Sequence, residues 1–236
     1  MMILRSILFY LFMTIWTLFI AITCSIFLIK PNKYLYYACR IWSKGLLISL
    51  QIICNIRYKV IGKNNLPKLP YIVASKHQSA FETILFWQMF LPPIYILKKE
   101  LTKIPFFGWY LIRLEMIYIN RSSQSQALKH TIIETKKALD KNMAIIIFPE
   151  GTRTDPEHYS RRYFPGIKAL YSSSDVPVVP IALNSGMCWP GKKFIMKPGL
   201  ITVKILKPID PGLDKDIFMT QLNSTIENES QNLLKN

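Results

Sequence analysis

The feature that most limits how this chain can fold is a run of 23 residues, Ile7 to Ile29, that contains no charged side chain. Leucine, isoleucine and phenylalanine dominate the run, and Lys30-Pro31-Asn32 ends it. A helix of this length would extend roughly 35 Å, against about 30 Å of hydrocarbon in a bilayer. The run is too long for the apolar core of a signal peptide, and no small-residue cleavage site follows it. The sequence therefore predicts an N-terminal helix embedded in a membrane.

Charge is distributed unevenly along the chain. The formal net charge is +16, and no Asp or Glu precedes Glu82, whereas ten Lys or Arg residues do. Such a basic surface can attract nucleic acid or anionic lipid headgroups. The adjacent apolar run favours lipid and excludes a nucleic-acid partner, because basic residues beside a membrane helix contribute roughly 1 kcal/mol each against an anionic leaflet. Only Arg5 precedes the run and four basic residues follow it closely, so the positive-inside rule places the remainder of the chain in the cytoplasm if the run spans.

A second segment, Tyr34 to Ile56, is less hydrophobic and carries Arg40 and Lys44. Its apolar residues recur at helical spacing, and we expect an interfacial helix packed beside the first. Two alternatives stay open: a helix–turn–helix inserted into one leaflet, and a single anchor whose second helix belongs to the soluble domain. The expected division of the chain is membrane-anchoring helices at residues 1–56 and a second domain at residues 57–236.

After the anchor, short β-like runs alternate with helical stretches, which predicts an α/β layered domain. The predicted strands are Arg57–Gly62, Tyr71–Ser75, Ile94–Lys98, Met116–Asn120, Ala144–Phe148, Val178–Leu183, Phe194–Lys197 and Ile201–Leu206. The predicted helices are Ser79–Phe90, Ser122–Lys141 and Ile167–Ser172. At the C-terminus, Phe218, Leu222 and Ile226 have the spacing of a closing helix whose expected role is packing alone.

A histidine and a carboxylate follow the predicted buried strand Tyr71–Ser75. His77 suits a general base because the ordinary pKa of histidine, about 6.5, lets it accept a proton near neutral pH. A carboxylate bound to its other ring nitrogen would fix the tautomer and stabilise the imidazolium. Glu82 can do this only if His77 lies in the turn that enters the helix and Glu82 lies on the first helical turn, because positions five apart diverge by about 140° within a helix.

A second motif, Phe148-Pro149-Glu150-Gly151-Thr152-Arg153, follows the apolar run Ala144–Ile147. Gly151 permits a backbone conformation or a close approach that a Cβ atom would hinder. Thr152 offers a hydroxyl group, and Arg153 offers a bidentate fork that suits a phosphate group.

Together and in this order, His77 with Glu82 and the segment 148–153 resemble the two signature motifs of the glycerophospholipid acyltransferase family, in the branch of 1-acyl-sn-glycerol-3-phosphate acyltransferases. The resemblance spans roughly Tyr71 to Leu183. It implies the glycerolipid acyltransferase fold, an α/β fold with a mixed sheet flanked by helices and an N-terminal membrane-embedded helical anchor. The family usually has Asp where this chain has Glu82, so an extra methylene must be accommodated.

The resemblance also implies roles for further residues. His77 and Glu82 would be catalytic, and substrate would meet Glu150, Gly151, Thr152 and Arg153. Arg121, after an apolar strand, matches the family's second phosphate-binding arginine, although Glu115 replaces the glycine that usually precedes that strand. Either Lys98 or Lys99 matches the family's lysine near the phosphate.

The expected function is transfer of an acyl group from acyl-CoA or acyl-ACP to the sn-2 hydroxyl of 1-acylglycerol 3-phosphate, which forms phosphatidate in phospholipid biosynthesis. The expected partners are these substrates, the lipid bilayer and acyl carrier protein, at a bacterial inner membrane with the catalytic domain on the cytoplasmic side. No cofactor and no metal are expected, because the three histidines and four cysteines lack ligand spacing. The alternatives are an acyltransferase for another lyso-lipid or for glycerol 3-phosphate, and a non-catalytic membrane lipid-binding module.

Overall fold

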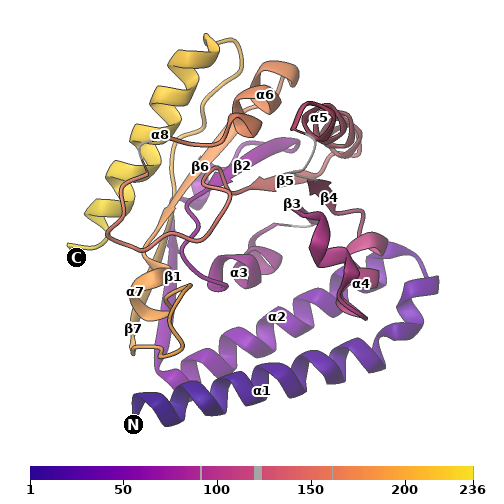
Figure 1. The fold of residues 1–236 in the computed structure, drawn as a ribbon, viewed down its shortest axis with the longest axis vertical. Coiled ribbons are helices and arrows are strands. Elements are labelled where there is room, and N and C mark those ends of the chain that lie inside the picture. Colours follow the sequence, from indigo (N-terminus) through magenta and orange to yellow (C-terminus); the bar gives the residue numbers. More distant parts are fainter. Residues whose placement is uncertain (91, 120–123, 161, 236) are drawn as a thin grey trace.

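A mixed sheet forms the centre of the molecule, as predicted (Figure 1). The computed structural model describes residues 1–90, 92–119, 124–160 and 162–235. Within these residues seven strands lie in the order β1-β7-β6-β2-β5-β3-β4. Neighbouring strands are parallel except β6 and β7, which are antiparallel. The strands are β1 (Ile56–Ile61), β2 (Tyr71–Ser75), β3 (Pro93–Lys98), β4 (Ile117–Ile119), β5 (Ala144–Ile147), β6 (Val178–Leu183) and β7 (Gly199–Ile205).

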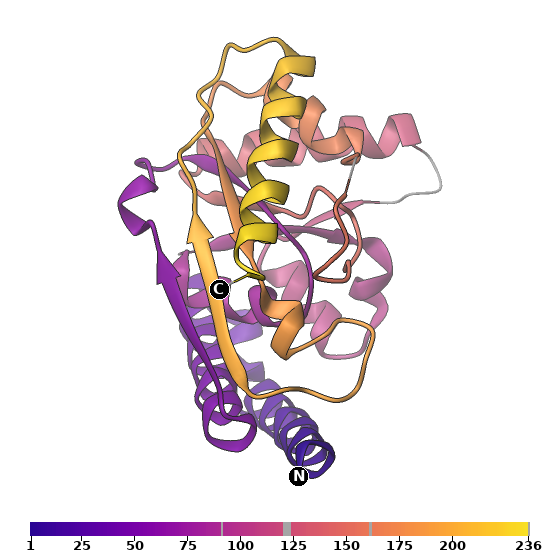
Figure 2. The same ribbon diagram turned by 90° about the vertical axis from the view of Figure 1, so that its left-hand side faces the viewer.

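Helices cover both faces of the sheet, because successive residues of a buried strand point to opposite sides. Tyr71 and Val73 of β2 pack into one core, whereas Ile72 and Ala74 pack into the other. The first core lies against α1 (Met2–Thr23), α2 (Asn32–Cys54), α3 (Phe81–Met89) and α4 (Phe107–Arg113). The second lies against α5 (Gln124–Asp140), α6 (Pro165–Ser173) and α8 (Lys215–Asn232). Figure 2 shows α8 lying against the sheet, where it packs on β6.

The N-terminal apolar helix ends earlier than the sequence suggests. Instead of continuing to Ile29, α1 ends at Thr23, and a 3-10 turn over Ser25–Ile29 returns the chain antiparallel to itself in α2 (Figure 1). Two tryptophans join the helices: the Trp16 indole donates to the Trp42 carbonyl, and the Trp42 indole donates to the Thr17 hydroxyl, each at 3.0 Å. Gly45 permits this approach, since a Cβ there would lie 2.6 Å from Trp16 Nε1.

The two helices differ in what they bury. Among the described residues, α1 is the one helix long and apolar enough to cross a membrane, and its buried residues are Ser6 and Phe9. In contrast, α2 buries Leu35, Leu46 and Leu50 in the protein core and contacts α3. The outer surface of α1 is therefore apolar and uncovered, which supports membrane association, whereas α2 packs on α1 and on α3 at once.

The expected strand Phe194–Lys197 was wrong. These residues form a loop that leads into β7, and the backbone donors of Met196 and Lys197 are satisfied elsewhere, by the Ser6 hydroxyl of α1 and the Cys188 carbonyl. Met196 is 2% exposed, so the apolar pattern reflects burial against the N-terminal helix rather than pairing in the sheet. Two short helices were not predicted: α4, and α7 (Ser185–Cys188).

Candidate active site

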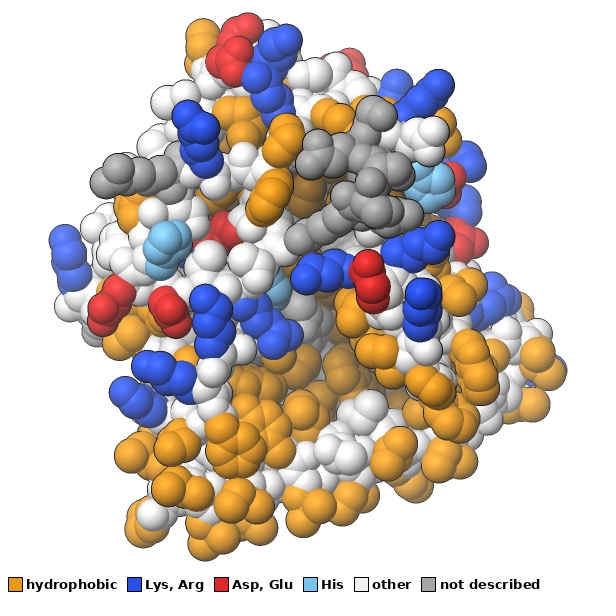
Figure 3. Space-filling view, in the orientation of Figure 1, with side chains coloured by type: hydrophobic (Ala, Val, Ile, Leu, Met, Phe, Trp, Pro, Cys, Tyr) orange, Lys and Arg blue, Asp and Glu red, His pale blue; other side chains and the backbone are white. Residues whose placement is uncertain are grey.

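A large cavity of about 1300 Å³ connects the N-terminal helices with both sequence motifs. Leu18 of α1 and Trp42 of α2 line it, and so do His77 and Arg153. Figure 3 shows this face hollowed between an apolar lower part, where Figure 1 draws α1 and α2, and a region of Lys and Arg above it. The cavity therefore has an apolar portion beside α1 and α2 and a polar portion beside the motifs.

His77 and Glu82 meet in the geometry that their spacing requires. β2 ends at Ser75, His77 lies in the following turn, and Glu82 lies on the first turn of α3. His77 Nδ1 is 2.9 Å from Glu82 Oε1. The imidazole stacks on the Phe148 ring, with ring centroids 4.0 Å apart. One ring nitrogen of His77 is thus held by the carboxylate, and the ring faces a wall of the cavity formed by the second motif.

Glu82 is fully buried, and polar groups surround its carboxylate. The backbone amides of Gln78 and Ser79 donate to Oε1 at 2.7 and 2.8 Å, and the hydroxyls of Ser79 and Ser185 donate to Oε2 at 3.0 and 2.8 Å. Burial raises the pKa of Glu82, but its hydrogen bond to His77, the charge of His77 and the backbone amides outweigh burial, so the pKa lies below its ordinary value. The carboxylate is therefore ionised at neutral pH, and Nδ1 of His77 carries the proton.

Glu150 is buried behind the turn that carries His77. Its Oε2 accepts the backbone N–H of His77 at 2.8 Å, and its Oε1 accepts from Lys76, Thr154 and Ser160. Only 2% of its side chain is exposed. Substrate binding by Glu150 stays a prediction; in this structure its acceptor oxygens are occupied by groups of the protein that hold the turn carrying His77.

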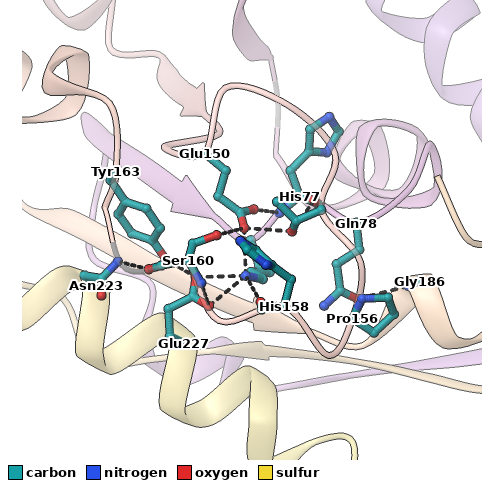
Figure 4. A network of polar contacts seen from close by, with 12 residues as sticks. His77, Gln78, Glu150, Pro156, His158, Ser160, Tyr163, Gly186, Asn223 and Glu227 are labelled. Atoms are coloured by element: carbon teal, nitrogen blue, oxygen red, sulfur yellow. Dashed lines mark hydrogen bonds and ion pairs between the residues drawn. The ribbon is translucent and has the colours of Figure 1, made fainter. Parts of the chain in front are cut away.

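Figure 4 shows a polar network in which Glu150, Ser160, Tyr163 and Glu227 converge. Within this network a buried lysine joins the first motif to the C-terminal helix. Lys76 is fully buried, and its ammonium group lies 2.7 Å from Glu150 Oε1 and 2.8 Å from Glu227 Oε2. Tyr163 donates to Glu227 at 2.7 Å. Burial and the charge of Glu227 raise the pKa of Tyr163, so its phenol stays protonated and can donate. The C-terminal helix was expected only to pack; through Glu227 it also neutralises a charge directly beside His77.

The residues of the second motif are divided between two roles. Gly151 has φ of +64°, which confirms that the turn needs a conformation that favours glycine. Gly151, Thr152 and Arg153 all line the cavity, whereas Glu150 does not. Arg153 has no carboxylate partner among the described residues, so its guanidinium is available to an anion.

The structure separates the two candidate lysines. Lys98, at the end of β3, is exposed and lines the cavity, whereas Lys99 begins a 3-10 helix and is not among the lining residues. Arg121 lies outside the described residues. Glu115, the residue that the resemblance sets against the family's glycine, has φ of +58°, a left-handed backbone conformation that is uncommon for a non-glycine residue.

Among the described residues, neither the thiol of Cys188 nor any cluster of potential metal ligands forms a second reactive centre. Burial raises the pKa of Cys188 to about 11, which leaves its thiol protonated. No group of three or more His, Cys, Asp or Glu side chains converges as a metal site within the described ranges.

Fold, motifs and cavity agree with a comparison to known families. The family model described as Acyltransferase matches residues 57–184, which is more than half of the chain. The chain belongs to this acyltransferase family, and the resemblance inferred from the two motifs is confirmed.

Individual relatives extend the agreement. The chain is 37% identical over 204 residues to a 1-acyl-sn-glycerol-3-phosphate acyltransferase of Pseudomonas aeruginosa, covering 85% of this chain and 79% of that protein. It is 30% identical over 172 residues to the Saccharomyces cerevisiae protein of the same name, covering 71% of this chain but only 56% of the yeast protein. The crystal structure of the 1-acyl-sn-glycerophosphate (LPA) acyltransferase from Thermotoga maritima superposes with a TM-score of 0.80 at 23% identity, over 100% of this chain and 97% of that one. That similarity shows that the two proteins share a fold.

Three residues of the site escaped the sequence analysis. Lys76 was counted only as one of the ten basic residues before Glu82. Ser185 lies on a short helix that was not predicted, and Glu227 lies on a helix that was expected only to pack. A lysine between a strand with no exposed residue and the histidine was the one local signal that a buried counter-charge must exist.

Proposed function

We propose that this protein transfers an acyl group from an acyl thioester to the free sn-2 hydroxyl of 1-acylglycerol 3-phosphate and so forms phosphatidate. The names of the Pseudomonas and yeast relatives support this reaction. The observation that carries the proposal is the His77–Glu82 pair, whose imidazole lines a cavity that also runs along the apolar helices α1 and α2. A lipid acceptor can thus keep its chain in an apolar space while its hydroxyl meets the imidazole.

His77 is the proposed general base. With Nδ1–H donated to Glu82, Nε2 of the neutral ring is the nitrogen that can accept a proton. It takes the hydroxyl proton as the acceptor oxygen attacks the thioester carbonyl. The C–S bond then breaks, and the imidazolium returns the proton to the leaving thiolate. Glu82 stabilises the imidazolium between these events. Both steps proceed without an acyl-enzyme.

Basic side chains that line the cavity are the proposed binding groups for the phosphate of the acceptor. Arg153 offers a bidentate fork, and Lys98 offers a point charge at the end of a neighbouring strand. The backbone and hydroxyl of Gly151 and Thr152 lie on the same wall. Arg121 remains a second phosphate-binding candidate on the resemblance alone.

The setting of the reaction is also proposed. Residues 1–56 would anchor the protein, and residues 57–236 would hold the acyltransferase domain on the cytoplasmic side of a bacterial inner membrane. The basic residues that follow α1 support this orientation. Acyl-CoA and acyl-ACP both present the thioester that the mechanism needs, and neither requires a further cofactor.

An assay with purified protein tests the reaction. Labelled 1-acylglycerol 3-phosphate is incubated in mixed micelles with acyl-CoA or with acyl-ACP, and the lipids are separated. Phosphatidate is the expected product, and the donor that supports it is thereby identified. Parallel reactions with lysophosphatidylcholine, lysophosphatidylethanolamine and glycerol 3-phosphate test the alternative acceptors. Acylation of one of these in place of 1-acylglycerol 3-phosphate would overturn the proposed substrate, and the absence of any product would favour a lipid-binding module.

A further inference from the structure

We propose that residues 104–112 form a second membrane-contacting surface, far from α1 in sequence but adjoining it in space. The α4 surface, as we call it, consists of five large apolar side chains: Ile104, Phe106, Phe107, Trp109 and Ile112. They are 46%, 44%, 43%, 52% and 54% exposed, respectively. Five such residues within nine positions form an exposed apolar patch, and exposing such a patch to water is unfavourable.

The α4 surface is one side of an amphipathic element. Gly108, Leu111 and Leu114 face inward and are buried. A Cβ at Gly108 would lie 2.0 Å from the Thr102 carbonyl oxygen, so the helix is tightly held against the preceding 3-10 turn. The inner side chains supply the packing that holds this helix in place, and the outer side chains need another partner.

Polar contacts tie α4 to the turn between α1 and α2. The Tyr110 hydroxyl donates to the Ala21 carbonyl at 2.7 Å. Arg113 donates to the Leu28 and Lys30 carbonyls, each at 2.8 Å. Figure 1 accordingly draws α4 beside the end of the hairpin that carries this turn. The α4 surface and the apolar outer surface of α1 therefore belong to one continuous side of the molecule.

Continuity with α1 and the neighbouring charges identify the partner as a bilayer. A membrane that accepts α1 covers the α4 surface at the same time, whereas a protein partner would have to compete with lipid there. Lys98, Lys99 and Lys103 are exposed just before the apolar residues, and basic side chains beside exposed aromatic ones are typical of an interfacial segment. We assign the α4 surface to the boundary between headgroups and acyl chains.

This surface also borders the cavity. Ile104, Phe106, Phe107 and Tyr110 line it together with residues of α1. If the proposed function holds, the α4 surface would place the cavity rim at the depth from which a lysophospholipid leaves the bilayer.

Spectroscopy tests the contact without relying on activity. Full-length protein labelled with 5-fluorotryptophan is placed in bicelles, and the ¹⁹F signal of Trp109 is assigned by its loss in Trp109→Phe. We expect 5-doxyl phosphatidylcholine to broaden this signal and a water-soluble gadolinium chelate to leave it sharp. The reverse pattern, or no broadening by either agent, would overturn the proposal. Trp189, 4% exposed in the domain, is the internal reference.

Kinetics test the consequence separately. Trp109→Ser/Ile112→Ser changes two exposed residues that do not line the cavity. We expect turnover of long-chain 1-acylglycerol 3-phosphate in vesicles to fall roughly tenfold, because apolar burial in lipid is lost. Turnover of a water-soluble short-chain acceptor should stay unchanged.

Ile133→Ser/Ile217→Ser is the matched control, because these residues are 44% and 58% exposed on α5 and α8. Equal losses in both pairs of variants, or equal losses on both acceptors, would contradict the role of the α4 surface. Failure of the proposed function would abolish both kinetic readouts in the wild type yet leave the ¹⁹F result standing.

Discussion

At the scale of single residues, His77 helps to keep Glu82 ionised, and the ionised Glu82 in turn fixes the orientation and tautomer of the His77 ring. Glu82 keeps its charge in a fully buried place because backbone amides, two serine hydroxyls and His77 all donate to it. Its longer side chain, relative to the family's Asp, still reaches the amides of Gln78 and Ser79. The departure from the family pattern is thus accommodated within the first turn of α3.

Removal of the imidazole should affect chemistry without affecting attachment. We expect His77→Ala to lower kcat on the order of 10²–10⁴-fold, the usual contribution of a general base, while the protein stays in the membrane fraction. His130→Ala, on the exposed side of α5, is the control and should retain full activity. Full turnover in His77→Ala would remove the base from the mechanism.

The pKa of Glu82 gives a pH-dependent prediction for stability. Because folding lowers this pKa below its ordinary value of 4.5, ionised Glu82 contributes stability that is complete above pH 4.5 and is lost as the pH falls through the folded-state pKa. Glu82→Gln keeps the shape but not the charge. We expect a gap in Tm between wild type and variant at pH 7 that narrows as the pH falls below 4.5, measured by thermal unfolding in detergent. A gap that is independent of pH would show that the charge is not the stabilising feature.

At the scale of elements, α8 is part of the support of the site. Glu227 reaches across from the C-terminal helix to Lys76, and Glu150 connects Lys76 to the backbone of His77. Asn223 of α8 donates to the Ser160 carbonyl at 2.7 Å, which fastens the loop after the second motif to the same helix. The C-terminal helix therefore holds both motifs against each other.

Two ion pairs on α8 allow a matched comparison. Glu227→Ala should reduce the free energy of unfolding by about 3–5 kcal/mol, because it leaves a buried ammonium with one carboxylate partner fewer. Glu229→Ala breaks the partly exposed pair with Lys204 on the same helix and should cost less than about 1 kcal/mol. Denaturant unfolding in micelles measures both. Equal losses would mean that burial of the Lys76 network has no energetic consequence.

At the scale of the whole molecule, the apolar side formed by α1 and α4 is separated from the polar side that carries the motifs (Figure 3). The cavity lies between the two and is lined from both. This arrangement suits a reaction between a lipid held in a membrane and a donor that arrives from water.

Charges on the outer surface of α1 should weaken attachment. Leu11 and Ile15 are 55% and 58% exposed and lie one turn apart. Leu11→Lys/Ile15→Lys places two charges near the middle of α1, each unfavourable by about 2.5–3.5 kcal/mol inside a bilayer. We expect a smaller fraction of this variant to resist carbonate extraction of membranes, whereas Ile133→Lys on α5 should behave like the wild type. Undiminished retention would indicate that α1 is not the anchor.

Local patterns in the sequence determined the parts of this protein that depend on near neighbours. The buried strand before His77, the carboxylate on the first turn of α3, the left-handed turn at Gly151 and the uncharged run in α1 all follow from side-chain type and short spacing. Only the tertiary structure decided the rest. Glu227 meets Lys76 across 151 positions, and Ser185 meets Glu82 across 103. The loop at Met196 was taken for a strand because burial against α1 and burial in a sheet leave the same apolar pattern. Pairings of this kind depend on which elements pack together, and no local periodicity carries that information.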